Sequence, residues 1–245
     1  SMRTFDDVLA GNYWTFPEET ATIANYTAVF EGGKMGRFFL NSIIITLPTV
    51  IGTLFLSSLA GYSLAMHRFK LNLLVFAMFI AGNFVPFQIL MIPVRNISIE
   101  MGVYNTHIGL IIFHIAFQTG FCTFFLRNFI KELPFELIEA ARADGATEWT
   151  IYRKIILPLI VPALAALGVL EFTFIWNDYF WALVLTQGDT VKPITVGLDV
   201  LRGQWTTSWN LVSAGSVVAA LPPVIMFFIL QRQFIQGLTF GAVKG

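Results

Sequence analysis

Five long apolar stretches constrain the fold of this chain more than any other feature. They cover residues 38–66, 71–94, 106–126, 155–176 and 211–234, and none has a Lys or Arg well inside it. A helix needs about 20 apolar residues to cross the hydrocarbon core of a membrane with its backbone groups paired. Only 12% of the 245 residues are charged, against roughly a quarter in soluble domains. The sequence therefore predicts an all-α membrane protein with five membrane helices.

Basic residues in the links between these stretches predict the orientation. The link 67–70 reads His-Arg-Phe-Lys, and the link 127–154 contains five Lys or Arg residues. The links 95–105 and 177–210 hold only Arg95, Lys192 and Arg202, and Trp residues stand near their edges. Because basic links stay on the cytoplasmic side, we expect the first pair of links inside and the second pair outside.

This orientation places residues 1–37 outside as an external N-terminal segment, the membrane domain at 38–234, and a C-terminal tail, 235–245, inside. Nothing in residues 1–37 resembles a signal peptide that could carry the segment across. We therefore expect a sixth membrane helix before Ser1. A five-helix chain with an external N-terminus is the alternative.

Composition argues against several other classes of function. The net charge is zero without long basic runs, so the sequence predicts no nucleic-acid partner. The single cysteine, Cys122, can form no disulfide within the chain and reads as a buried apolar side chain. His107 and His114 are seven residues apart without an evident third ligand, so we expect no metal site.

The link 127–157 contains the most informative residues. Pro134 suits a first helical position, Glu136 suits the first turn, and Gly145 can adopt the left-handed conformation that ends a helix. Thr147 is a candidate N-cap for a second helix. The pattern predicts a helix-turn-helix with a small apolar face, which either enters a partner's groove or lies against the chain's own cytoplasmic ends.

One spaced motif adds a resemblance. Glu139-Ala140-Ala141, Gly145 three residues later, then Ile155 and Leu157-Pro158 resemble the "EAA" signature of permeases in binding-protein-dependent ABC importers. The resemblance implies a type I ABC importer transmembrane domain, with residues 134–150 as the coupling helix that docks in an ATPase cleft. The implied coupling residues are Glu136, Glu139, Ala140, Ala141, Asp144, Gly145, Leu157 and Pro158.

Two further stretches are similar to carbohydrate permeases of the maltose-permease G type: Trp176-Asn177-Asp178-Tyr179, and the end of the chain from Gln231. In that family the tail reaches between two ATPase subunits. The resemblance therefore implies contacts there for Gly237, Gly241, Lys244 and Gly245, and an extended backbone for the tail. A solvated terminus is the alternative.

Polar residues inside the apolar stretches are candidates for a substrate path, because ionisable groups at membrane depth are costly. Sugars are bound by hydrogen bonds and by aromatic faces, so these residues could line a sugar path. The alternative is that they form hydrogen bonds between helices. The candidates are Asn83, Gln88, His114, Gln118, Glu171 and Asn177.

The sequence has no G-x-x-x-x-G-K-[ST] phosphate loop, so we expect no cofactor in this chain and ATP with Mg²⁺ in a separate ATPase. It also lacks a recognisable catalytic motif, so we do not expect an enzyme. The predicted function is a sugar-importing permease of the bacterial inner membrane. Its predicted partners are a second permease, two ATPase copies, an external sugar-binding protein, the sugar and lipid. An ion-coupled secondary transporter and a membrane enzyme or assembly protein are the alternatives.

Overall fold

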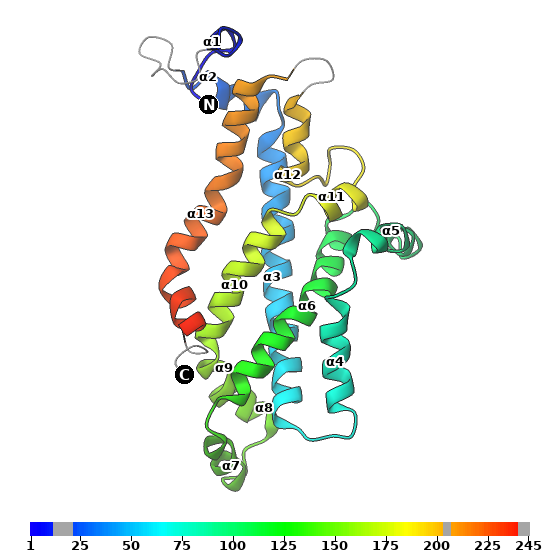
Figure 1. The fold of residues 1–245 in the computed structure, drawn as a ribbon, viewed down its shortest axis with the longest axis vertical. Helices are drawn as coiled ribbons and strands as arrows, with labels where there is room; N and C mark the ends of the chain where they lie inside the picture. The colour runs from blue at the N-terminus through cyan, green and yellow to red at the C-terminus, as the bar shows by residue number, and fades with distance from the viewer. Residues whose placement is uncertain (12–21, 203–206, 240–245) are drawn as a thin grey trace. The chain divides into compact units, whose positions relative to one another are not determined.

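The computed structural model describes residues 1–11, 22–202 and 207–239, with side chains described as far as residue 231. Within these ranges every regular element is a helix (Figure 1). The elements are α1 (Phe5–Leu9), α2 (Ala24–Glu31), α3 (Met35–Met66), α4 (Asn72–Gly82), η1 (Phe87–Leu90), α5 (Met91–Glu100), α6 (His107–Lys131), α7 (Phe135–Ala143), α8 (Glu148–Ile151), η2 (Tyr152–Ile156), α9 (Leu157–Leu159), α10 (Val161–Trp176), α11 (Phe180–Leu185), α12 (Ile194–Gly197), η3 (Leu198–Arg202) and α13 (Trp209–Thr239).

The chain divides into two compact units. One comprises residues 1–46, 91–110 and 176–225, and the other comprises residues 47–90, 111–175 and 226–245. The boundaries fall inside α3, α6, α10 and α13 and between η1 and α5. We describe each unit by itself.

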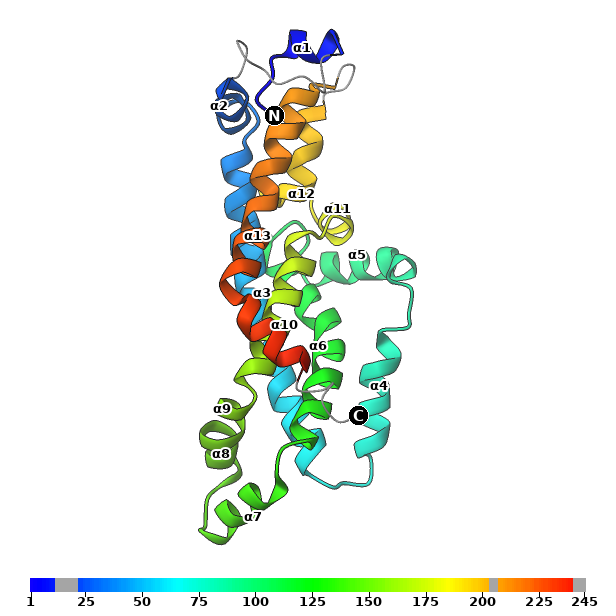
Figure 2. The same cartoon turned by 60° about the vertical axis from the view of Figure 1, so that its left-hand side comes forward.

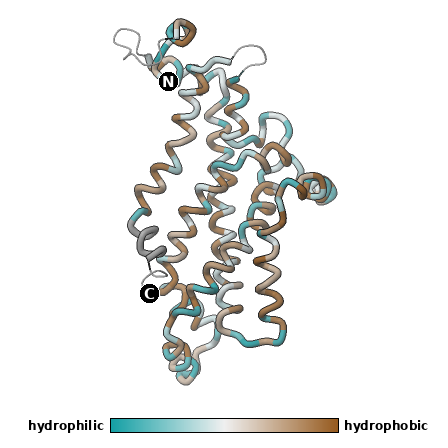
Figure 3. The backbone as a smooth tube through the Cα atoms, viewed as in Figure 1, coloured by the Kyte–Doolittle hydropathy of each residue, from teal (hydrophilic) through white to brown (hydrophobic). Residues whose placement is uncertain are grey.

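Three helices are long and apolar enough to cross a membrane: α3, α6, and α13 over Trp209–Gln231. Two bent helix pairs meet the same criteria when each pair is taken as one span, so the described residues provide three to five spans. The expected number of five is reached only by counting both bent pairs. Figure 3 shows long hydrophobic runs along the helices and hydrophilic residues at the link after α3 and in α7.

The second expected membrane helix, residues 71–94, is not one continuous helix but a bent pair of helices. α4 ends at Gly82, and after a break at 83–86 the helical path resumes at Phe87 with a bend of 88°. Pro86 lacks a backbone N–H and disfavours helical geometry at Val85, which explains an interruption here. The 11 residues of α4 extend only about 16 Å, too short to span the hydrocarbon core alone.

The fourth expected helix, residues 155–176, is also broken. η2 is a π-helix over Tyr152–Ile156, and the chain bends by 70° between Leu159 and Val161. Pro162 cannot donate a backbone hydrogen bond to Pro158, and its ring would collide with that carbonyl group in a straight helix. The bend therefore follows from the two prolines.

The buried core of the second unit packs the ends of α3 and α6 against the segment from α7 to α10. Its members include aromatic and aliphatic side chains far apart in sequence: Tyr62, Met66, Cys122, Leu126, Ile130, Ile138, Ile151, Tyr152, Ile156, Ile160, Ala163 and Leu167. By contrast, Leu73 and Met78 of α4 are 74% and 66% exposed. An apolar surface of this kind suits lipid or other membrane helices.

In the first unit, Asn41 of α3 connects three parts of the chain. Its amide donates to the carbonyl oxygens of Thr190 and Lys192 at 3.0 Å each, and its Oδ1 lies 2.9 Å from His107 Nε2. Ser42 Oγ accepts the Ile194 backbone N–H at 2.9 Å. These contacts hold the segment between α11 and α12 against α3.

Candidate functional site: the helix pair α7 and α8

The turn between α7 and α8 is built from local hydrogen bonds. Gly145 has φ +79°, its N–H donates to the Arg142 carbonyl, and the Ala146 N–H donates to the Ala141 carbonyl at 2.9 Å. This pair of bonds is a Schellman motif, which requires a left-handed residue after the helix. Thr147 then caps α8 by accepting the Thr150 N–H. The predicted stop and N-cap are confirmed, while Pro134 is the N-cap residue of α7 rather than its first helical residue.

One face of α7 is held by the chain itself. Ile138 is 1% exposed and belongs to the buried core, and Ala141 and Ala146 pack against that core from either side of the turn. The sequence identified Ala141 but missed Ile138. The sequence pattern that could have identified Ile138 is its spacing of three residues from Ala141, which places both on one helical face.

Other apolar side chains of this helix pair are exposed. Phe135 and Leu137 are 46% and 47% exposed, Ala140 is also exposed, and Trp149 of α8 is 56% exposed. Figures 1 and 2 both show α7 beyond α8 and the end of α6. Large apolar side chains on a projecting element suit docking by another protein.

Glu148 connects this helix pair to the end of α3. Its Oε2 accepts the Tyr62 hydroxyl at 2.6 Å and lies 3.3 Å from His67 Nε2. Its Oε1 accepts Arg142 Nε at 3.0 Å. The hydrogen bond to Glu148 raises the pKa of Arg142 above its usual value, so this cation remains charged. One carboxylate therefore ties the last turn of α7 and the start of α8 to α3.

Aromatic packing supports the same connection. The Tyr152 ring lies 5.4 Å from Trp149 and 5.5 Å from Tyr62, and its hydroxyl is 2.7 Å from Ser58 Oγ. Sequence reasoning missed Tyr62 and Glu148 as a pair because 86 residues separate them. The acidic residue after a predicted N-cap was the only local signal.

The other predicted coupling residues lie along the same helical segment. Glu136, Glu139 and Asp144 are exposed, and Asp144 is the C-cap residue of α7. Leu157 packs partly against the core, whereas Pro158 is exposed. The exposed acidic residues are thus free to contact a partner, and their role in coupling stays a prediction.

The predicted path residues differ in their burial and in their contacts. Glu171 is fully buried, accepts the Cys122 thiol at 3.1 Å and interacts electrostatically with His114, which is 5% exposed. Asn83 donates to the Phe79 carbonyl at 2.8 Å, a bond within its own helical turn. Gln118 is half-buried, and Gln88 and Asn177 are exposed.

Of the predicted tail residues, Gly237 lies in α13, which continues to Thr239. The backbone at Gly237 is therefore helical, and the expectation of an extended tail from residue 235 was wrong at this position. Gly241, Lys244 and Gly245 lie outside the described residues.

Long apolar helices and bent apolar spans define a multi-pass helical membrane protein. Residues 53–240 match the family described as "Binding-protein-dependent transport system inner membrane component". The chain belongs to this family of ABC transporter permeases.

Curated relatives resemble the chain over most of their length. AraQ of Halalkalibacterium halodurans, the arabinooligosaccharides transport system permease protein, is 37% identical, with 94% of this chain and 82% of AraQ covered. MelC of Bacillus subtilis, the melibiose/raffinose/stachyose import permease protein, is 36% identical, with 95% and 84% covered. GgtD of Synechocystis, the osmoprotective compounds uptake permease protein, is 35% identical, with 100% and 84% covered.

Solved structures show the same fold. A bacterial ABC transporter involved in the import of the acidic polysaccharide alginate superposes with a TM-score of 0.83 at 22% identity, covering 95% of this chain and 86% of the other. The MetNI methionine ABC transporter gives a TM-score of 0.66 at 19% identity, covering 83% and 95%. The type I ABC importer fold expected from the EAA signature is thus confirmed.

Proposed function

We propose that this chain is a permease subunit of an ATP-driven importer that moves a sugar or oligosaccharide across the bacterial inner membrane. The observation that carries the proposal is the helix pair α7 and α8, in which Ile138 is packed in the core while Phe135, Leu137 and Trp149 stay exposed. Relatives named for arabinooligosaccharides and for melibiose, raffinose and stachyose support a saccharide as the substrate class.

The proposed assembly contains a second permease, two ABC ATPase subunits and an external sugar-binding protein. A solved alginate ABC transporter in complex with a periplasmic protein shares the fold at a TM-score of 0.72 and 18% identity, which supports a partner of this kind. ATP and Mg²⁺ would bind in the ATPase, since the sequence has no phosphate loop.

The proposed mechanism is alternating access. The ATPase binds α7 through exposed side chains such as Phe135, Leu137 and Ala140, and its closure moves α7. The Glu148 contacts with Arg142 and Tyr62 transmit that movement to α3, and the packing of Ile138 transmits it to the rest of the core. Because packed cores switch between discrete arrangements rather than deform continuously, a small shift of α7 can change which side of the membrane is open.

Transport in proteoliposomes tests this proposal. We expect saccharide uptake to require ATP and the ATPase, and to persist when proton and sodium gradients are collapsed. Gly145→Pro removes the left-handed turn and the Gly145 N–H bond, and Glu139→Lys reverses an exposed charge on α7. Both variants should abolish uptake while sugar binding to the external protein stays normal. Normal uptake in both would refute the coupling role, and uptake driven by an ion gradient alone would refute the ATP-driven function.

A further inference from the structure

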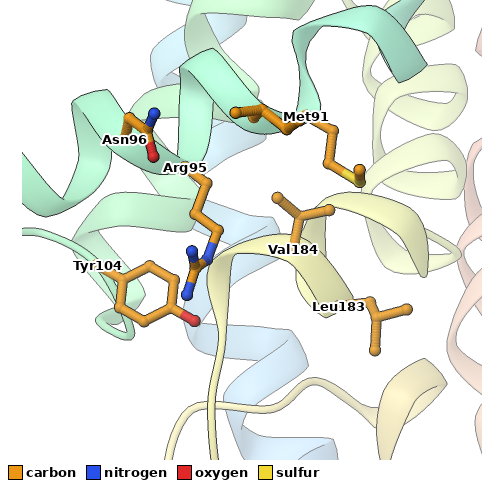
Figure 4. A pocket seen from close by; sticks show the side chains of 7 residues that line it. Met91, Arg95, Asn96, Tyr104, Leu183 and Val184 are labelled. Carbon is orange, nitrogen blue, oxygen red and sulfur yellow. The ribbon is translucent and has the colours of Figure 1, made fainter.

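A pocket of about 410 Å³ lies in the first unit, between α5 and α11. Two hydrogen bonds hold the link after α5 to the end of α11: the Asn105 N–H donates to the Leu185 carbonyl at 3.0 Å, and Asn105 Oδ1 accepts the Gln187 N–H at 2.8 Å. Asn105 has φ +56°, which fixes this turn. Figure 4 shows the side chains that line the pocket: Met91, Ile92, Arg95, Asn96, Tyr104, Leu183 and Val184.

The pocket contains a cation without a carboxylate partner. The Arg95 guanidinium lies 5.2 Å from the centre of the Tyr104 ring, and among the described residues no ion pair includes Arg95. Arg202, another external arginine, pairs with Asp199 at 3.6 Å. A guanidinium stacked on an aromatic ring keeps its planar donors available at its edge, where they match phosphate oxygens.

Aliphatic side chains form the rest of the pocket. Met91, Ile92 and Leu183 are 40%, 65% and 52% exposed. Positive charge beside aliphatic surface matches a ligand that is anionic at one end and apolar along the other. A sugar fits less well, because Arg95 covers the face of Tyr104 on which a sugar ring would stack.

We propose that this pocket binds an anionic phospholipid, with the phosphodiester on Arg95 and an acyl chain along Met91, Ile92 and Leu183. The location supports this occupant, since Arg95 directly follows an apolar stretch and begins a link that the distribution of basic residues assigns to the outside of the membrane. The bound lipid would join α5 to α11. This inference depends on the membrane location and not on the identity of the imported substrate.

The test measures lipid binding to the full chain with its partner subunits. The purified, delipidated complex is titrated with phosphatidylglycerol, with phosphatidylcholine and with inorganic phosphate, and bound lipid is counted by native mass spectrometry. We expect saturable phosphatidylglycerol binding, little phosphatidylcholine binding, and no displacement by millimolar phosphate. Arg95→Gln should weaken phosphatidylglycerol binding by about tenfold or more, because a charge-assisted hydrogen bond to the phosphate is lost.

Arg202→Gln is the matched control, because it removes an external arginine that is already paired. Arg95→Lys keeps the charge without the planar fork and should lie between Arg95→Gln and the original protein. Equal binding of both lipids, or an equal loss in Arg95→Gln and Arg202→Gln, would overturn the proposal. Displacement by inorganic phosphate would assign the site to free phosphate instead. If Arg95→Gln left lipid binding unchanged but abolished the stimulation of transport by the external binding protein, Arg95 would instead be assigned to a contact with a carboxylate of that protein.

Discussion

Ile138 and Leu137 are neighbours in sequence with opposite environments, and substituting each by alanine separates internal anchoring from partner docking. Ile138 is 1% exposed inside the core, whereas Leu137 is 47% exposed. Ile138→Ala removes three buried carbons, which costs about 2.4 kcal/mol at ~0.8 kcal/mol for each. The remaining cavity brings the expected loss to roughly 2–5 kcal/mol. Leu137→Ala should change the stability of α7 by less than about 1 kcal/mol, as exposed substitutions do.

Hydrogen–deuterium exchange of a peptide covering residues 130–152 measures this difference. A loss of about 2 kcal/mol in the free energy of local opening should accelerate the exchange of α7 amides by about 30-fold in Ile138→Ala. Exchange in Leu137→Ala should stay close to that of the original protein, while its co-purification with the ATPase should decrease. Unchanged exchange in Ile138→Ala, or equal acceleration in both variants, would refute the assignment of Ile138 to internal packing and of Leu137 to partner docking.

Three further predictions concern other contacts. In the same exchange experiment, Gly145→Ala should destabilise the α7–α8 turn by about 1–2 kcal/mol, because φ at this position is +79°. The added methyl group meets no atom within 4 Å, so the loss would come from backbone strain alone, and unchanged exchange would contradict it. Glu148→Gln retains the shape of the side chain but loses the charge that holds Arg142, so ATP hydrolysis should continue while less sugar is transported per ATP. An unchanged ratio of sugar transported to ATP hydrolysed would exclude Glu148 from coupling. Hydrogen bonding to Lys34 lowers the pKa of Asp189, so the contact between the two side chains should persist from neutral pH to about pH 4 and weaken below it. Limited proteolysis of the 187–193 segment as a function of pH measures this. Proteolysis that rises already between pH 7 and 5 would contradict this assignment.

The sequence alone determined those features that depend on neighbouring residues. Hydrophobic length identified α3, α6 and α13 as membrane-spanning, because a bilayer imposes the same length on any helix that crosses it. Gly145 and Thr147 predicted the end of α7 and the start of α8, because Schellman turns and N-caps are made within a few residues. The EAA spacing, with Glu139 and Gly145 at fixed positions, pointed to the family that the comparisons establish.

Composition could not show where an apolar stretch would break, although Pro86, Pro158 and Pro162 were visible. A proline removes one backbone donor, but the surrounding packing decides whether the helix continues or turns. α3 contains Pro48 and continues, whereas the chain turns by 88° around Pro86. The same residue type therefore has different outcomes, and periodicity does not distinguish them.

Only the tertiary structure decided which side chains meet across long separations. Tyr62 and Glu148 are 86 residues apart, and Cys122 and Glu171 are 49 apart, so no local pattern relates them. The inward position of Ile138 likewise depends on the core that α3, α6 and α10 build around it. Local steric and hydrogen-bonding rules act over a few residues, whereas burial is a property of the whole packed unit, and this is why the sequence predicted the helix pair but not what holds it.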